Sequence, residues 1–242
     1  MTELLTAAQM RAIERAAIES GQVTGLELME RAGRGAVDAI LAEWPELAEG
    51  PHRAVVLCGP GNNGDDGFVV ARLLKERGWG AEVFLYGDPE KLPPDARVNW
   101  ERWNTGGSVR PLNFPSVSED DEQSVYHAIW IEPKRAGEEI VCIDALFGTG
   151  LSRGLSGLRP VLHLFDECWG FFPNVHIVSL DLPTGISADS GEVVGGPETF
   201  AIRADLTVAF HSKKVGHAQN AGLKECGTVR VVDIGLPGCG RD

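Results

Sequence analysis

The chain has 242 residues, 43% of them hydrophobic, and a formal net charge of −13. This length is enough for one large α/β domain with a proper core, and the negative charge argues against a nucleic-acid-binding surface. No apolar run is long enough to cross a membrane, and the start of the chain lacks the pattern of a signal peptide. The five cysteines form no CxxC pair, which suits a reducing cytoplasm. Taken together, these features predict a cytoplasmic protein that binds neither membranes nor nucleic acids.

Two amphipathic helices are predicted at the start of the chain. Thr6 is a good N-cap for the first helix, because Gln9 stands three residues later and completes a capping-box pattern. This helix is expected to run to about Ser20, with Ile18 among the apolar residues of one side. The second helix is expected over about Gly25–Trp44.

A glycine-rich turn between a strand and a helix is the most informative local feature. Residues 55–57 predict a buried strand, GPGNNGDDG follows, and a helix is expected from about Phe68. A second strand over Ala81–Leu85 completes a βαβ unit. Glycines let a backbone approach phosphate closely, and the N–H groups at a helix start attract an anion. The turn has GxGxxG spacing and lacks the Gly-Lys-Ser/Thr of a Walker loop, so it predicts a ligand site of another kind.

Strands and helices alternate along the rest of the chain. Helices are expected over 96–103 and 158–169, and strands over 109–112, 140–143, 176–180, 204–210 and 228–234. The acidic cluster at residues 119–122 is predicted to be a solvated loop. The alternation predicts a three-layer αβα fold with a mainly parallel sheet. No internal repeat or domain boundary is visible, which favours a single domain over residues 1–242.

Three predicted strands end in polar turns that each hold an aspartate: Asp66, Asp144 and Asp181. The carboxyl ends of parallel strands lie on one edge of the sheet, so the three turns are expected to build one site. Clustered carboxylates cost free energy unless a cation or substrate hydroxyls accompany them. An aspartate that caps the following helix explains one such turn well, and three turns poorly.

Four motifs, in a fixed order, resemble a known family. GPGNNGDDGFVVAR, IDALFGTGLSRG, SLDLPTGISADSG and ADLTVAFHSKKVG are followed by a terminal DIGLP. The sequence is similar to the YjeF N-terminal-domain family, the NAD(P)H-hydrate (NAD(P)HX) epimerases. The resemblance implies a Rossmann-like fold and interconversion of the R and S epimers of NADHX and NADPHX. It also implies a separate S-specific dehydratase as functional partner, and a homodimer.

The resemblance also assigns roles to residues. Substrate contacts are implied for Asn62, Asn63, Gly64, Asp65, Asp66, Gly148, Thr149, Gly150, Leu151, Ser152, Arg153, Gly154 and Asp181. One potassium ion per subunit is implied at Asn63, Asp144 and Thr184. Two residues depart from the family pattern: Asp65 replaces a usual glycine, which adds a negative charge near a phosphate, and Thr184 replaces a serine while keeping the hydroxyl.

The implied reaction needs an acid–base group. The carbon to be inverted bears a hydroxyl beside the ring nitrogen, so loss of hydroxide leaves an iminium that water attacks from the other face. Asp144 is the first candidate to move these protons, Asp181 is its rival, and Lys214 is expected to lower an aspartate pKa or contact a phosphate. His211 and His217, which flank Lys214, are expected to be structural.

Two other functions fit parts of the sequence. A non-catalytic binding scaffold of the same fold is the main alternative, although such scaffolds tend to lose loop carboxylates, which this chain keeps. A methyltransferase with a related sheet would leave the DALFGTG and DLPTG turns unexplained.

Overall fold

The computed structural model describes residues 4–112, 125–128, 139–168, 170–196 and 199–238. Within them, seven parallel strands form one sheet in the order β3-β2-β1-β4-β5-β6-β7. The strands are β1 (Arg53–Cys58), β2 (Gly80–Leu85), β3 (Val109–Pro111), β4 (Ile140–Ala145), β5 (Val175–Leu180), β6 (Leu206–Phe210) and β7 (Thr228–Val232). The predicted mainly parallel sheet is therefore confirmed.

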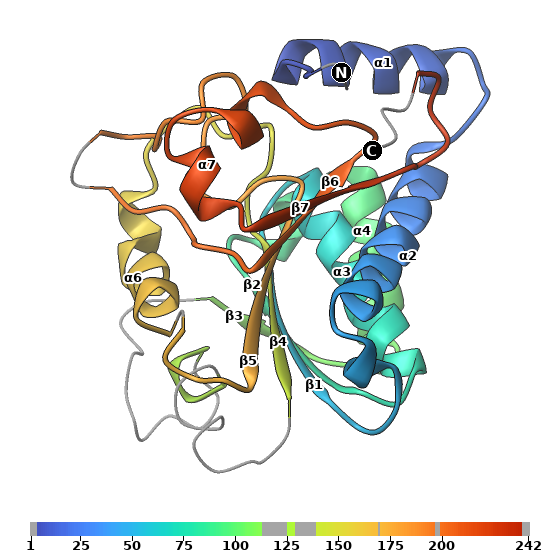
Figure 1. The fold of residues 1–242 in the computed structure, drawn as a ribbon. Helices are drawn as coiled ribbons and strands as arrows, with labels where there is room; N and C mark the ends of the chain where they lie inside the picture. The colour runs from blue at the N-terminus through green and yellow to red at the C-terminus, as the bar shows by residue number, and fades with distance from the viewer. Residues whose placement is uncertain (1–3, 113–124, 129–138, 169, 197–198, 239–242) are drawn as a thin grey trace.

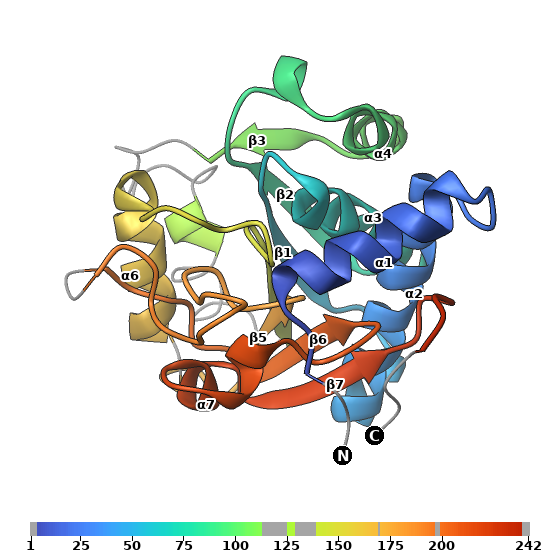
Figure 2. The ribbon, with the colours of Figure 1, turned by 90° about the horizontal axis from the view of Figure 1, so that it is seen from above.

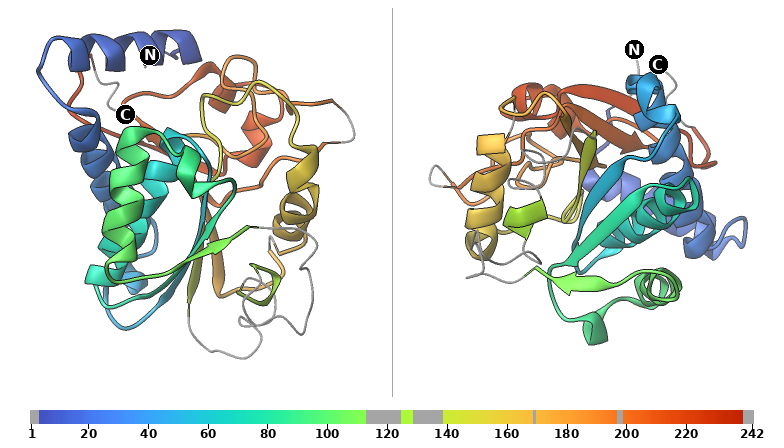
Figure 3. Two further views of the ribbon diagram at one scale, coloured as in Figure 1. Left: turned by 180° about the vertical axis from the view of Figure 1, so that it is seen from behind. Right: turned by 90° about the horizontal axis from the view of Figure 1, so that it is seen from below.

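The helices lie on both faces of this sheet. They are α1 (Ala7–Glu19), α2 (Gly25–Glu43), α3 (Asn62–Glu76), α4 (Pro94–Asn104), α6 (Arg159–Cys168) and α7 (Gly222–Glu225). Figure 1 shows α2, α3 and α4 together on one face and α6 on the other. The views from behind and below in Figure 3 show the same layers, so the predicted αβα arrangement is confirmed.

The central strands are buried on both faces, which explains their unbroken apolar sequences. In β1, Val56 and Cys58 pack in the cluster on the α2 and α3 side, whereas Val55 and Leu57 pack in the cluster that contains Phe165 of α6. All six residues of β4 are buried. Strands covered on both sides lose the alternation of apolar and polar residues that marks a strand with one wet face.

Helix α1 lies across the carboxyl edge of the sheet, as the view from above in Figure 2 shows. The predicted capping box is present, since Thr6 N donates to Gln9 Oε1 at 2.8 Å and Gln9 N donates to Thr6 Oγ1 at 3.2 Å. Leu5 pairs with the segment that follows β6, because its N–H donates to Lys213 O at 3.0 Å. Ile18, predicted on the apolar side, is 42% exposed.

Helix α3 begins earlier than the sequence suggests. It starts at Asn62, with Gly61 as N-cap, rather than at about Phe68. Asn and Asp disfavour helix interiors but are tolerated in a first turn, where backbone donors have no helical acceptor. The Asn-Asp segment is therefore the beginning of a helix and not a loop.

Some expectations fall outside the described residues, among them the acidic cluster at residues 119–122. Within the ranges described, no helix combines the length and apolar character that crossing a bilayer requires.

Candidate active site

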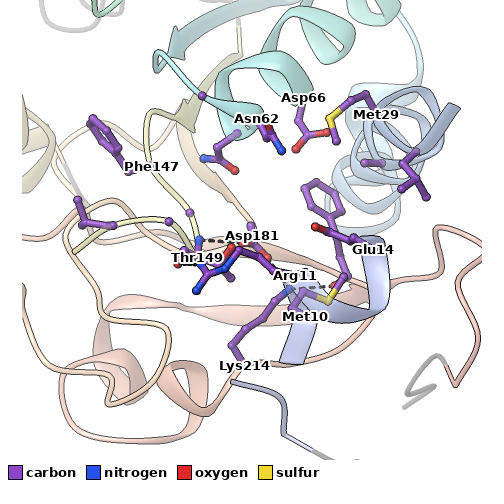
Figure 4. A pocket seen from close by; sticks show the side chains of 18 of the residues that line it. Met10, Arg11, Glu14, Met29, Asn62, Asp66, Phe147, Thr149, Asp181 and Lys214 are labelled. Atoms are coloured by element: carbon purple, nitrogen blue, oxygen red, sulfur yellow. Dashed lines mark hydrogen bonds and ion pairs between the residues drawn. The ribbon is translucent and has the colours of Figure 1, made fainter. Parts of the chain in front are cut away.

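The turns that follow β1, β4 and β5 meet at one edge of the sheet. The strand register places Cys58 beside Ala145, and Asp144 beside Ser179. A cavity of about 360 Å³ lies at this edge, lined by the turns, by α1, α2 and the start of α3, and by Lys214. Figure 4 shows its side chains. The convergence expected from three separate motifs is observed.

The first turns of α3 form one wall of the cavity. Asn62, Asn63 and Asp66 line it, whereas Gly64 does not. Gly64 instead packs on the turn after β1, where an added Cβ would lie 2.0 Å from the carbonyl oxygen of Gly59. No side chain caps the start of α3. Its first N–H groups are therefore available to an anion in the cavity.

Asp65 points away from the cavity. Its side chain is 2% exposed and does not line the site, and its Oδ1 accepts a hydrogen bond from Asn99 Nδ2 of α4 at 2.6 Å. Burial raises the pKa of Asp65 to about 6, with Asp95 adding to the rise while Asn99 and Arg102 oppose it. The implied substrate contact of Asp65 is therefore corrected: this carboxyl joins α3 to α4, and it adds no charge beside a phosphate.

Asp144 is sealed inside the protein and does not line the cavity. Its Oδ1 accepts from Thr184 Oγ1 at 2.6 Å, and its Oδ2 accepts from Thr184 N at 2.7 Å and Ser179 Oγ at 2.9 Å. Burial raises the pKa of Asp144, and these hydrogen bonds limit the rise. This geometry does not support Asp144 as the acid–base group, because its oxygens hold the turn after β5 against β4 and the residue does not line the cavity.

Asp181 and Lys214 both line the cavity as a buried ion pair. Lys214 Nζ donates to Asp181 Oδ1 at 2.5 Å and to Phe210 O at 2.9 Å, and Thr149 N donates to Asp181 Oδ2 at 3.1 Å. Burial would raise the pKa of Asp181, but the ammonium of Lys214 outweighs it and holds that pKa below its usual value. Asp181 is consequently ionised, and Lys214 has the expected effect on an aspartate.

His217 supports this pair from behind. Lys214 N donates to its Nδ1 at 2.8 Å, which leaves Nε2 to donate to the carbonyl oxygen of Asp181 at 2.7 Å. Burial, assisted by the nearby Lys214 charge, lowers the pKa of His217 to about 4. A neutral imidazole thus fixes the backbone of Asp181, whose φ of 64° lies in the left-handed region.

Asp66 differs from the other two aspartates. It is 5% exposed and lines the cavity, and its Oδ1 has no hydrogen-bond partner. Burial raises its pKa well above the usual value, and the charges of Asp65, Asp181 and Glu14 raise it further, against the opposing charge of Lys214. Burial and the neighbouring carboxylates therefore favour the protonated form of this carboxyl.

Two cavity residues on α1 were missed in the sequence. Glu14 lines the site, and its pKa is raised by burial and by the charge of Asp181. Arg11 also lines the site, and its Nη1 donates to Thr149 O at 3.3 Å. No local pattern marks either residue, because only the packing of α1 across the sheet edge brings them to the site.

The turn after β4 separates two neighbouring cavities. Gly148, Thr149, Gly150 and Leu151 line the first one. Ser152, Arg153 and Gly154 line a second cavity of about 640 Å³, which also includes Tyr86. The two cavities share the following residues: Pro60, Phe147, Gly150 and Leu151. The segment implied for substrate contact thus runs from one cavity into the other.

The residues implied for potassium offer oxygen atoms near the turn after β4. Thr184 Oγ1 bonds to Asp144 and also accepts from Phe147 N at 3.0 Å. The carboxamide nitrogen of Asn63 is buried with no hydrogen-bond partner. Turning the Asn63 carboxamide by about 180° would place its oxygen at the position of this nitrogen. The side-chain oxygens of Asn63, Thr184 and Asp144 are then ligands of the kind that suits a hard monovalent cation.

Comparison with known proteins gives one consistent result. The family model "YjeF-related protein N-terminus" matches residues 25–216. A Roseobacter litoralis protein named NAD(P)H-hydrate epimerase is 47% identical over 98% of this chain and 100% of its own length. A Salinibacter ruber protein named bifunctional NAD(P)H-hydrate repair enzyme Nnr is 36% identical over 97% of this chain and 41% of its own. The crystal structure of yeast ynu0, YNL200c, has a TM-score of 0.70 at 22% identity, covering 89% of this chain and 83% of that one, which supports the fold.

Proposed function

The chain belongs to the family of YjeF-related N-terminal domains, and we propose that it is an NAD(P)H-hydrate epimerase. It would interconvert the R and S forms of hydrated NADH and NADPH at C6 of the nicotinamide ring. The S form then serves a dehydratase that restores the reduced cofactor, a coupling in keeping with the bifunctional repair enzyme among the relatives.

One observation carries the proposal: a single cavity joins an uncapped helix start to buried carboxyl groups. The start of α3 suits the phosphates of a dinucleotide, because free N–H groups and the helix dipole favour an anion. Asp66 and Asp181 suit proton transfer at a hydroxyl, because the pKa of the first is raised by burial and that of the second is lowered by Lys214 despite its burial. A binding scaffold would need the first feature but not the second.

The cavities also suit the size of the substrate. A space of about 360 Å³ takes a nicotinamide ring with part of its ribose, but not a whole dinucleotide. We assign the hydrated ring to this cavity and the remainder of the molecule to the adjoining space of about 640 Å³. The pyrophosphate would then cross near Pro60 and Gly150, which line both cavities, at the start of α3.

The reaction follows from the chemistry of the hydrated ring. A proton donor assists departure of the C6 hydroxyl as water, the ring nitrogen supplies electrons to form an iminium, and water adds to the opposite face. The Asp181–Lys214 pair forms a fixed polar wall beside the ring, held in place by Thr149 and His217. Preorganised groups of this kind need no rearrangement as charge develops.

We further propose potassium as a cofactor, held by Asn63, Thr184 and Asp144. When bound, it supplies a fixed positive charge that draws the phosphate end of the substrate toward the turn after β4. The buried carboxamide nitrogen of Asn63, which has no hydrogen-bond partner, supports this assignment. Thermal unfolding in potassium chloride against sodium chloride at equal ionic strength tests it. We expect a higher Tm in potassium that Asn63→Leu abolishes, and equal Tm values would contradict the site.

The central experiment follows the recovery of NADPH absorbance. Purified protein is mixed with R and S NADPHX and an S-specific dehydratase, and the R fraction should be consumed only when this protein is present. Asn62→Asp is a matched variant, because it keeps side-chain size and adds a negative charge at the start of α3. It should raise KM. Persistence of the R fraction with folded wild-type protein would favour the scaffold alternative.

Two further expectations remain proposals. A homodimer through the N-terminal helices would be detected by light scattering on a sizing column. A reducing cytoplasmic setting agrees with Cys58 and Cys226, which are buried thiols outside any disulfide within the described part of the chain, and localisation of a tagged chain tests it.

A further inference from the structure

We propose that Asp66 is the proton donor to the departing C6 hydroxyl, a role that the sequence had offered to Asp144 or Asp181. This inference rests on the proposed epimerase function. It assigns the acid of that reaction to a residue on α3.

The hydrogen bonding of the three aspartates separates their roles. Both carboxyl oxygens of Asp144 accept hydrogen bonds from Thr184. In Asp181, Oδ1 accepts from Lys214 Nζ and Oδ2 accepts from the backbone N–H of Thr149. Asp66 Oδ1 is buried and has no partner, although the residue lines the cavity. A buried polar atom without a partner is rare in a folded protein, and here it leaves one carboxyl oxygen for a ligand.

Burial and the charges around the cavity favour the protonated form of Asp66. Glu14 faces it from α1, Asp65 lies beside it on α3, and Asp181 faces it from the end of β5. The opposing cations are already engaged, Lys214 by Asp181, and Arg11 of α1 by the carbonyl oxygen of Thr149. Burial and repulsion together raise the pKa of Asp66 and favour its neutral acid form.

Asp66 and the ion pair enter the cavity from different elements. In Figure 4, Asp66 projects from α3, and Asp181 and Lys214 lie below it in the view. All three residues line the cavity. A ring placed there would have Asp66 toward one face and the polar wall toward the other. This arrangement suits a reaction in which water leaves one face and returns to the opposite one.

The proton balance closes over one turnover. The Asp66 O–H gives its proton to the C6 hydroxyl, the C–O bond breaks with its electron pair on the leaving water, and the nitrogen lone pair forms the C6–N1 double bond. A second water adds to C6 and releases a proton, which returns to Asp66 through solvent in the open cavity. The ring gains and loses one water, and no oxidant or other reactant is required.

Asp66→Asn and Asp65→Asn are the matched pair that tests the assignment. Each replaces a buried carboxyl by a carboxamide of the same size, and only Asp66 reaches the cavity. Asp66→Asn should lower kcat by at least about 100-fold with KM within about threefold, since a positioned acid contributes at least that factor. Asp65→Asn should keep wild-type kcat at low pH and move the fall in rate to lower pH, because the Asp65 charge contributes to the raised pKa of Asp66.

The pH profile supplies an independent readout. The wild-type rate should fall as pH rises through the raised pKa of Asp66, because the protonated form is the active one. The residual rate of Asp66→Asn should lose that fall, and Asp66→Glu should restore it together with part of the rate. A purely structural role would not move the profile in this way.

Each other outcome overturns the assignment. If wild-type protein epimerises NADPHX and Asp66→Asn does so within about threefold, Asp66 is not the acid and the proposed function stands. If Asp66→Asn unfolds at markedly lower temperature and Asp66→Glu restores stability but neither the rate nor the pH profile, the carboxyl is structural and is no donor. If wild-type protein fails to epimerise, both the function and the assignment fall.

Discussion

The three aspartates at the sheet edge show how neighbours decide the role of a residue. Asp144 is the last but one residue of β4 and ties β5 to it, Asp181 pairs with Lys214, and Asp66 has an oxygen without a partner. Sequence position placed all three at one edge correctly. It could not rank them, because two of the residues that bond to Asp144, Ser179 and Thr184, stand 35 and 40 positions away along the chain.

The buried ion pair gives a first prediction. Lys214→Met leaves Asp181 charged and uncompensated, so the free energy of unfolding should fall by about 3–5 kcal/mol at pH 8. In the wild type, the pKa of Asp181 lies below its usual value, and the stability it supplies is lost only in acid. In the variant that pKa rises above the usual value, so the deficit should shrink as pH falls from 8 to 5. Urea unfolding at the two pH values measures this.

The control for that experiment is the double variant Lys214→Met with Asp181→Asn. Removing the stranded charge should recover much of the stability at pH 8. An equal deficit at pH 5 and pH 8 in the single variant would contradict the argument, and would point to the lost bond with the Phe210 carbonyl.

Asp65 gives a second prediction, with the opposite sign. Its pKa is about 6 in the folded protein, above the usual 3.8, so the unfolded chain releases this proton first. Stability is therefore lost as pH rises from about 4 to about 6, and Asp65→Asn should remove that loss. A gain of about 3 kcal/mol at pH 8 and almost none at pH 4 is expected from urea unfolding. A variant that is less stable at pH 8 than the wild type would show that the bond with Asn99 needs the charge.

At the scale of elements, the sequence predicted the central strands well and the start of helix α3 poorly. The central strands β1 and β4 followed from apolar runs, because they are buried on both faces. The start of α3 was placed too late, because Asn and Asp are typical of both loops and first helical turns. The position of α1 over the cavity, with Arg11 and Glu14, left no mark in the local sequence, since the Leu5 pairing and the Asp189 bond that hold it are long-range.

Helix α1 gives the third prediction, because it covers the cavity. Thr6→Ala removes its capping box, and losing such a cap costs about 1 kcal/mol, or roughly a fivefold shift in local opening. Amide hydrogen exchange over residues 7–19 should accelerate by about that factor, and KM should rise.

Thr24→Ala is the matched control, since it removes the same kind of capping box from α2. It should leave exchange in α1 unchanged, because α2 is packed into the core through Ala36, Val37 and Ile40. Equal exchange of α1 in Thr6→Ala and wild-type protein would show that the bond from Ala7 N to Asp189 at 2.7 Å is enough to hold this helix.

At the scale of the whole molecule, two cavities at the sheet edge differ in their lining residues, which suggests that one serves the reaction and the other serves substrate binding. The first cavity holds the titratable groups Glu14, Asp66, Asp181 and Lys214, whereas Arg153 stands in the second, and the turn after β4 belongs to both. If the ring is transformed in the first cavity and the rest of the dinucleotide is bound in the second, a change in the second should affect binding far more than the chemical step.

Arg153→Glu tests that division. It reverses a charge in the second cavity, so we expect KM for NADPHX to rise about tenfold with kcat within about twofold, equivalent to roughly 1.4 kcal/mol of binding. Arg159→Glu makes the same change six positions along the chain, beside Phe200 and outside both cavities, and should leave KM unchanged. A fall in kcat that equals the rise in KM would instead mean that the second cavity positions the ring for reaction. Steady-state kinetics of the two variants, at equal ionic strength, distinguishes a binding role from a positioning one.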